Sequence, residues 1–129
     1  MTFEDFNSYS RDLMEKVVSM RDTKGKEYAG NKDRFDNFNR LAVKCGNLDR
    51  KLVWLVYFTK HMDAIESYIS NGREFSTESI EGRIVDAITY LTLLAGMIKE
   101  EKQINEISTY PTIQDLNAEE NNKNIYPGK

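Results

Sequence analysis

ESIEGRIVDAITYLTLLAGMIKEEK, residues 78–102, is the strongest helical signal in the chain. Its apolar residues recur at three- and four-residue steps, as they do along the buried face of an amphipathic helix. A second line of side chains on this helix begins with Arg83 and Asp86 and continues through Tyr90 to Met97. Because this line is charged at one end and apolar at the other, we look for function around Asp86.

Three more segments show helical periodicity: residues 3–22, 35–45 and 50–70. Local signals support their ends: a capping box formed by Thr2 and Asp5, an N-cap at Asp49, and a stop at Gly72. The connection at residues 71–77 is short, so the helices on either side should be antiparallel neighbours. The sequence therefore predicts an all-α fold with four antiparallel helices.

The chain should divide into a helical domain at residues 1–103 and an irregular tail or arm at residues 104–129, which holds both prolines. It has 129 residues and a net charge of -3, so its overall charge does not favour duplex DNA or an anionic membrane. One cysteine and one histidine exclude an internal disulfide and a Cys/His zinc site. No apolar run approaches the roughly 20 residues of a membrane span, and we expect a cytoplasmic protein.

The charged end of the helix at residues 78–102 is the first candidate site. If the turn is centred between residues 74 and 75, Asp63 faces Asp86 and Glu66 faces Arg83. Facing carboxylates repel each other unless a metal ion, a lysine or a shared proton lies between them. Their oxygens suit Mg²⁺. The alternative is that both aspartates point to water and that Glu66 and Arg83 form a surface ion pair.

A basic stretch at residues 23–34 is the second candidate, because Lys24 and Lys26 flank a glycine that would allow close approach to a phosphate. The alternative is a solvated loop. Lys60 and His61 could serve a phosphate or a base, although a lone histidine is more often structural.

Several short motifs resemble a group of small phage proteins near the "nucleotide modification associated" domain family. The resemblance spans roughly residues 20–100, and its motif residues are Lys24, Tyr28, Asn37, Phe38, Lys60, His61 and Asp86. That group is similar to the MazG-type all-α nucleoside triphosphate pyrophosphohydrolases. The resemblance implies a MazG-like fold in which Mg²⁺ is held by a pair of acids on one helix and an E-x-x-D motif on a later one.

Here the first pair resembles Asp63-x-x-Glu66, and the second is Arg83-x-x-Asp86. The resemblance thus implies that Asp63, Glu66 and Asp86 are the catalytic and metal-binding residues. Arg83 replaces one expected acid and could contact a phosphate without a metal.

Three functions follow as hypotheses. The first is a MazG-like phage protein that binds nucleotides and hydrolyses (modified) nucleoside triphosphates with Mg²⁺. The second is a non-catalytic sponge that sequesters a nucleotide defence signal, cyclic forms included. The third is a structural helical interaction module. The candidate nucleotide-binding residues are Lys24, Lys26, Tyr28, Asn37, Lys60, His61, Arg83 and Tyr90. Because residues 52–58 are apolar nearly all round the helix, we also expect a homo-oligomer, which the molar mass in solution tests.

Overall fold

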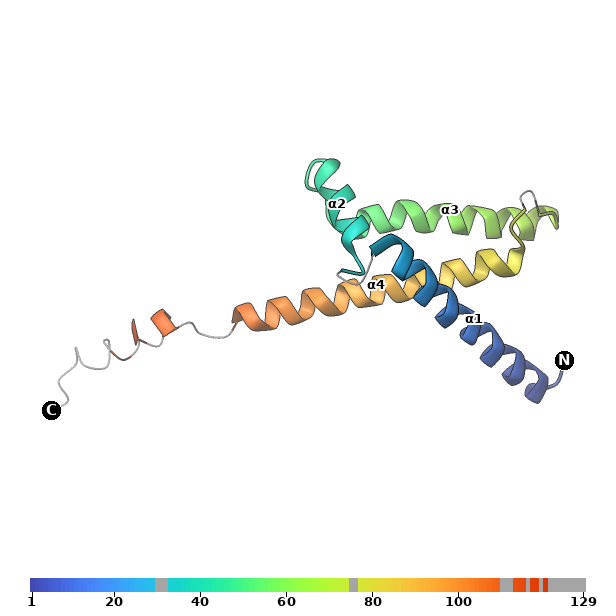
Figure 1. Cartoon of the computed structure of the whole chain (residues 1–129), viewed down its shortest axis with the longest axis horizontal. Helices are drawn as coiled ribbons and strands as arrows, with labels where there is room; N and C mark the ends of the chain where they lie inside the picture. Colours follow the sequence, from blue (N-terminus) through green and yellow to red (C-terminus); the bar gives the residue numbers. More distant parts are fainter. Residues whose placement is uncertain (30–32, 75–76, 110–112, 116, 119, 121–129) are drawn as a thin grey trace. The chain divides into compact units, whose positions relative to one another are not determined.

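The described part of the chain forms four helices in the computed structural model of the protein (Figure 1). The structure describes all residues except 30–32, 75–76, 110–112, 116, 119 and 121–129, and gives only the backbone of residues 25, 27–29 and 109. The helices are α1 (Phe3–Ala29), α2 (Asp36–Lys44), α3 (Arg50–Asn71) and α4 (Ile80–Thr109). The described residues contain no strand, so the predicted all-α class with four helices is confirmed.

Three helix ends form as their local sequence predicts. The Thr2 N–H donates to Asp5 Oδ2 at 3.0 Å and the Asp5 N–H donates to Thr2 Oγ1 at 3.1 Å, which is a reciprocal capping box. Asp49 accepts a hydrogen bond from the Lys51 N–H at the start of α3. Gly72 ends α3 in the left-handed region, with φ of 64°, where a side chain would be strained.

Helix α1 is longer than predicted and continues through Gly25 to Ala29. A single glycine inside a helix costs only about 1 kcal/mol relative to alanine, so the helix continues where neighbouring residues favour it. The predicted basic loop at residues 23–34 is therefore helical in its first half. This matters for the site because Lys24 projects from a regular helix instead of a loop.

Helix α4 differs from prediction at both ends. It begins at Ile80, where Ser79 Oγ accepts a hydrogen bond from the Gly82 N–H at 3.0 Å. Ser79 thus caps α4, inside the stretch that the sequence predicts to be helical. At its other end α4 reaches Thr109, so the first residues of the predicted irregular tail are helical.

The core forms where α2, α3 and α4 meet. Its buried residues are Phe38, Ala42, Val53, Trp54 and Met97. Trp54 stacks on Phe58 with 4.7 Å between ring centroids, and its indole N–H donates to the Tyr90 carbonyl at 2.6 Å. A Cβ added to Gly96 would lie 2.8 Å from Phe35 Cζ, so the missing side chain lets Phe35 pack against α4.

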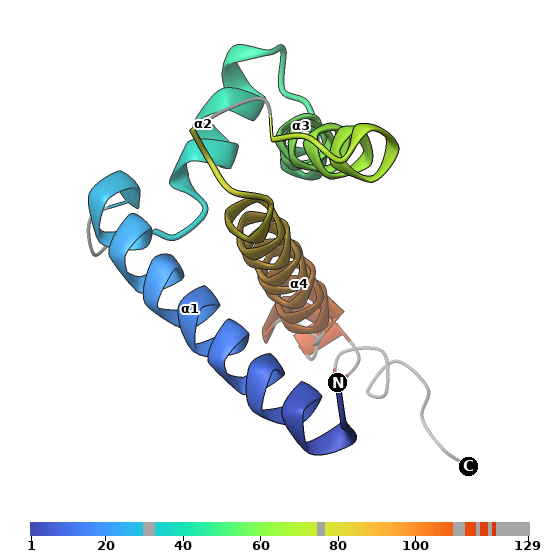
Figure 2. The same ribbon diagram turned by 90° about the vertical axis from the view of Figure 1, so that its right-hand side faces the viewer.

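Up to Met97, helix α4 lies between α1 and α3 (Figure 2). Lys16 of α1 forms an ion pair with Glu81 of α4. The chain divides into two compact units, Met1–Met97 and Ile98–Lys129, and α4 belongs to both. Everything that forms the site below lies in the first unit. None of the helices in the described parts combines the length and apolar character needed to cross a membrane.

Candidate functional site

All four helices contribute to one cleft of about 530 Å³. This volume is within the usual range of small-molecule sites, about 300–1,000 Å³. The residues that line the cleft are Lys24, Arg34, Asn37, Phe38, Arg40, Leu41, Tyr57, His61, Asp86, Thr89, Tyr90 and Leu93.

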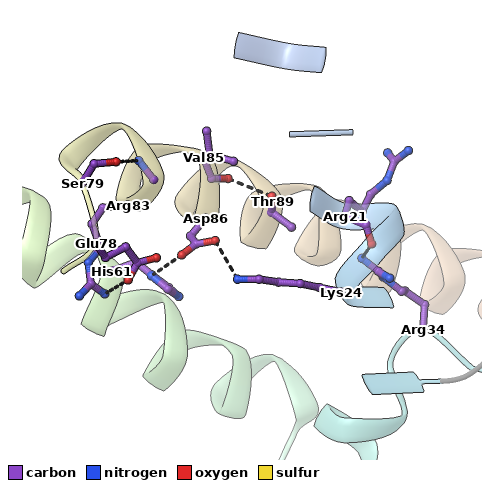
Figure 3. Close-up of polar contacts among 11 residues, drawn as sticks. Arg21, Lys24, Arg34, His61, Glu78, Ser79, Arg83, Val85, Asp86 and Thr89 are labelled. Atoms are coloured by element: carbon purple, nitrogen blue, oxygen red, sulfur yellow. Dashed lines mark hydrogen bonds and ion pairs between the residues drawn. The ribbon is translucent and has the colours of Figure 1, made fainter. Parts of the chain in front are cut away.

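Asp86 is the buried carboxylate of this cleft, with 5% of the residue exposed. Its Oδ1 lies 3.4 Å from Lys24 Nζ and its Oδ2 lies 4.0 Å from His61 Nδ1 (Figure 3). The Lys24 side chain is 46% exposed, so the ammonium reaches the carboxylate from the rim of the cleft. A buried charge is costly without a partner, and Lys24 is the cation that offsets the charge of Asp86.

His61 packs beside Asp86 without a hydrogen bond to it. Its ring centroid lies 4.7 Å from that of Tyr90, and its Nδ1 is buried with no hydrogen-bond partner among the described residues. Burial lowers the pKa of His61, and this effect outweighs the opposing attraction of Asp86, while Arg83 lowers the pKa further. His61 is therefore neutral at pH 7.

The lowered pKa of His61 predicts a loss of stability in acid. The unfolded chain takes up a proton at a higher pH than the folded chain does, so the free energy of unfolding falls as the pH drops below about 6.5. The loss stops once the pH is below the folded pKa. Urea denaturation at pH 5 to 8 measures this dependence, and His61→Asn should lack this contribution. The same pH dependence in both proteins would show that His61 is not its source.

Cations outnumber carboxylates in the cleft. Arg34 donates to the Arg21 carbonyl at 2.8 Å, and burial lowers the pKa of Arg34. A guanidinium nevertheless keeps its proton in proteins. Arg40 donates to Asn37 Oδ1 at 2.8 Å. With Lys24, these arginines supply three positive charges against one negative charge on Asp86, a balance of +2. The cleft is therefore electrostatically suited to an anionic ligand.

Aromatic rings form the wall beside the carboxylate. Tyr57 and Tyr90 lie roughly parallel with 6.4 Å between ring centroids. Phe38 meets each of them edge-on at 6.3 Å. Such rings provide a flat, apolar surface on which a nucleobase can stack.

The cleft contains six of the residues singled out from the sequence: Lys24, Asn37, Phe38, His61, Asp86 and Tyr90. Lys26, Lys60, Asp63 and Glu66 are exposed and do not line it. Arg83 lines a separate pocket of about 160 Å³ and pairs with Glu78 at 3.2 Å. The side chain of Tyr28 lies outside the described part of the structure.

The three carboxylates expected to hold Mg²⁺ are not brought together. Asp63 and Glu66 are exposed on α3, and it is His61 that lies beside Asp86. Burying a second carboxylate next to Asp86 would be unfavourable, because like charges in a low-dielectric site repel strongly. No group of three potential metal ligands occurs in the described ranges. These residues, as arranged here, do not fit the expected magnesium site.

The predicted nucleotide-binding residues do not include three others that line the cleft, Arg34, Arg40 and Tyr57, although Arg34 belongs to the basic stretch at residues 23–34. Two of them carry a local signal. Arg40 lies three residues after Asn37 and therefore on the same face of α2. Tyr57 lies four residues before His61 and therefore on the same face of α3. Arg34 has no such signal, because its position depends on the end of α1.

No protein-family model, curated protein or solved structure matches this chain. The resemblance drawn from its short motifs therefore stays a prediction. A function for this protein is inferred from the geometry of the cleft.

Proposed function

We propose that this protein binds nucleotides in the cleft and sequesters them without hydrolysis. The observation that supports this is the combination of three cations with a wall of aromatic rings in one cleft. The cations suit phosphate groups, and Arg34 and Arg40 can each offer two parallel N–H donors to one phosphate. The rings suit a base. Linear and cyclic nucleotides both carry a phosphate and a base, so both are candidate ligands.

The MazG-like arrangement expected from the sequence is part of this proposal. Trp54 contacts Tyr90, whereas His61, two turns later on α3, contacts Asp86, one turn earlier on α4. A residue further along α3 thus contacts a residue nearer the start of α4. This order supports α3 and α4 as antiparallel neighbours. A MazG-like bundle with a nucleotide cleft between its helices would have this order.

Hydrolysis of nucleoside triphosphates, the other expected activity, has less support than binding. It would require Asp63 and Glu66 to reach the same Mg²⁺ as Asp86, and both are exposed on α3. Lys24 also lies against the one carboxylate that faces the cleft. A sequestering protein needs only the cations and rings already present in the cleft.

A homo-oligomer is also proposed, because α3 exposes apolar side chains that a second copy could cover. Leu52 and Leu55 are each 49% exposed, and Val56 is 61% exposed. These residues adjoin Tyr57, which lines the cleft. Contiguous apolar surface of this kind marks interaction sites in soluble proteins.

A nucleotide panel with and without Mg²⁺ tests the proposed function. We expect nucleoside triphosphates to raise the melting temperature saturably in EDTA, because a ligand present at 100 times its Kd stabilises the folded state by about 2.7 kcal/mol. The corresponding nucleosides lack phosphate and should have little effect. The bound nucleotide should be recovered intact after heat denaturation.

Other results would contradict the proposal in distinct ways. A stabilising effect that requires Mg²⁺, with only hydrolysed product recovered, would support a pyrophosphohydrolase. The absence of an effect with every nucleotide, cyclic ones included, would support a structural interaction module.

A further inference from the structure

Asp86 is unsuited to contact a phosphate directly. It is the one acidic residue among those that line the cleft, and a carboxylate close to a phosphate would repel it. If a nucleotide occupies the cleft, its phosphates must lie near the cations, and a neutral part of the ligand must face Asp86.

The base is the part best placed to face this carboxylate. His61 connects Asp86 to the aromatic wall, because its Nδ1 lies 4.0 Å from Asp86 Oδ2 and its ring lies 4.7 Å from that of Tyr90. A base that stacks on this wall would bring its edge to the carboxylate.

A carboxylate accepts hydrogen bonds and cannot donate them when ionised. Guanine presents two adjacent donors, N1–H and the N2 amino group, and both can bind the two oxygens of one carboxylate. Adenine and cytosine place a ring-nitrogen acceptor beside their amino group. Uracil and thymine place a carbonyl oxygen on each side of their single N–H. Each of these acceptors would meet the negative charge of Asp86.

We infer that the cleft selects guanine nucleotides and that Asp86 is the residue that determines this specificity. The inference rests on the proposed nucleotide-binding function. Asp86 can accept hydrogen bonds from guanine because its existing contact is weak. Lys24 Nζ lies 3.4 Å from Oδ1, a long distance for a charged hydrogen bond. Lys24 is also half-exposed and can turn towards a phosphate while Asp86 binds the base.

Affinities for GTP, ITP, ATP and XTP test the inference by calorimetry on the full chain and on Asp86→Asn. For the natural chain we expect GTP to bind about tenfold more tightly than ITP, which lacks the N2 amino group, and ATP to bind at least as weakly as ITP. In Asp86→Asn the amide nitrogen can donate to the O2 of xanthine. The variant should therefore prefer XTP to GTP. Asp63→Asn is the matched control, because Asp63 is exposed outside the cleft, and it should retain the preference for GTP.

Each contrary result has a separate meaning. Equal affinity for all four nucleotides, or an unchanged preference in Asp86→Asn, would overturn the assignment of guanine while leaving nucleotide binding intact. A preference for GTP over dGTP without any preference among bases would place the sugar at Asp86 and also overturn it. If no nucleotide binds, the proposed function itself fails.

Discussion

Trp54→Ala is expected to lower the free energy of unfolding by about 3–5 kcal/mol, the usual cost of truncating a large buried aromatic residue. Trp54 is 6% exposed, stacks on Phe58 and donates its indole N–H to the Tyr90 carbonyl. Its loss leaves a cavity between α3 and α4, the two helices that carry His61 and Asp86. Because small domains have only about 5–15 kcal/mol of stability, this variant will be close to unfolding at 37 °C. Urea denaturation followed by circular dichroism measures the loss.

Trp54→Phe keeps most of the ring and removes the N–H donor, so it should cost less, about 1–2 kcal/mol. Ile69→Ala is the matched control on the same helix. Ile69 is 76% exposed, so its truncation should change stability by less than about 0.5 kcal/mol. Equal losses for Trp54→Ala and Ile69→Ala would contradict the described core.

Lys24→Met should affect both stability and binding. It removes the cation that lies 3.4 Å from the buried Asp86 and leaves that carboxylate poorly compensated. Because Lys24 is half-exposed, the expected loss of stability is about 1–2 kcal/mol, less than for a fully buried pair. Loss of a charged contact to phosphate should weaken nucleotide binding by about tenfold to a hundredfold. Calorimetry and urea denaturation measure the two effects separately.

Arg40→Ala separates the two effects, because Arg40 is exposed and does not pair with Asp86. We expect binding to weaken by about threefold to tenfold and stability to change little. Lys44→Ala is the control for charge alone: Lys44 is exposed on α2 and does not line the cleft. If Lys44→Ala weakens binding as much as Lys24→Met does, attraction by the overall charge, and not the cleft, would explain binding.

The features that could be predicted from the sequence are those that depend on neighbouring residues. The capping box of Thr2 and Asp5 forms within one turn, and Gly72 ends α3 because of its own backbone freedom. Asp86 could be identified as unusual because it stands at the charged end of a line of side chains that is apolar at its other end. None of these inferences requires knowledge of how the helices pack.

The features that could not be predicted depend on helix rotation and helix length. Asp63 was expected to face Asp86, but the rotation of α3 leaves Asp63 in solvent and places His61 there, since burying one carboxylate costs less than burying two. Lys24 reaches Asp86 because α1 continues through Gly25, where the local sequence predicts the end of the helix. Local spacing places Arg40 on the face of Asn37 and Tyr57 on the face of His61, but only tertiary packing brings these two faces together in one cleft.

The hydrogen bond from Trp54 to the Tyr90 carbonyl also gives the molecule a built-in optical reporter. The chain contains a single tryptophan, and that indole is bonded to the backbone of a residue that lines the cleft. Indole emission depends on the polarity around the ring and on what its N–H binds. Ligand entry at Tyr90 and exposure of the core should therefore both change the fluorescence of this one residue, without any attached label.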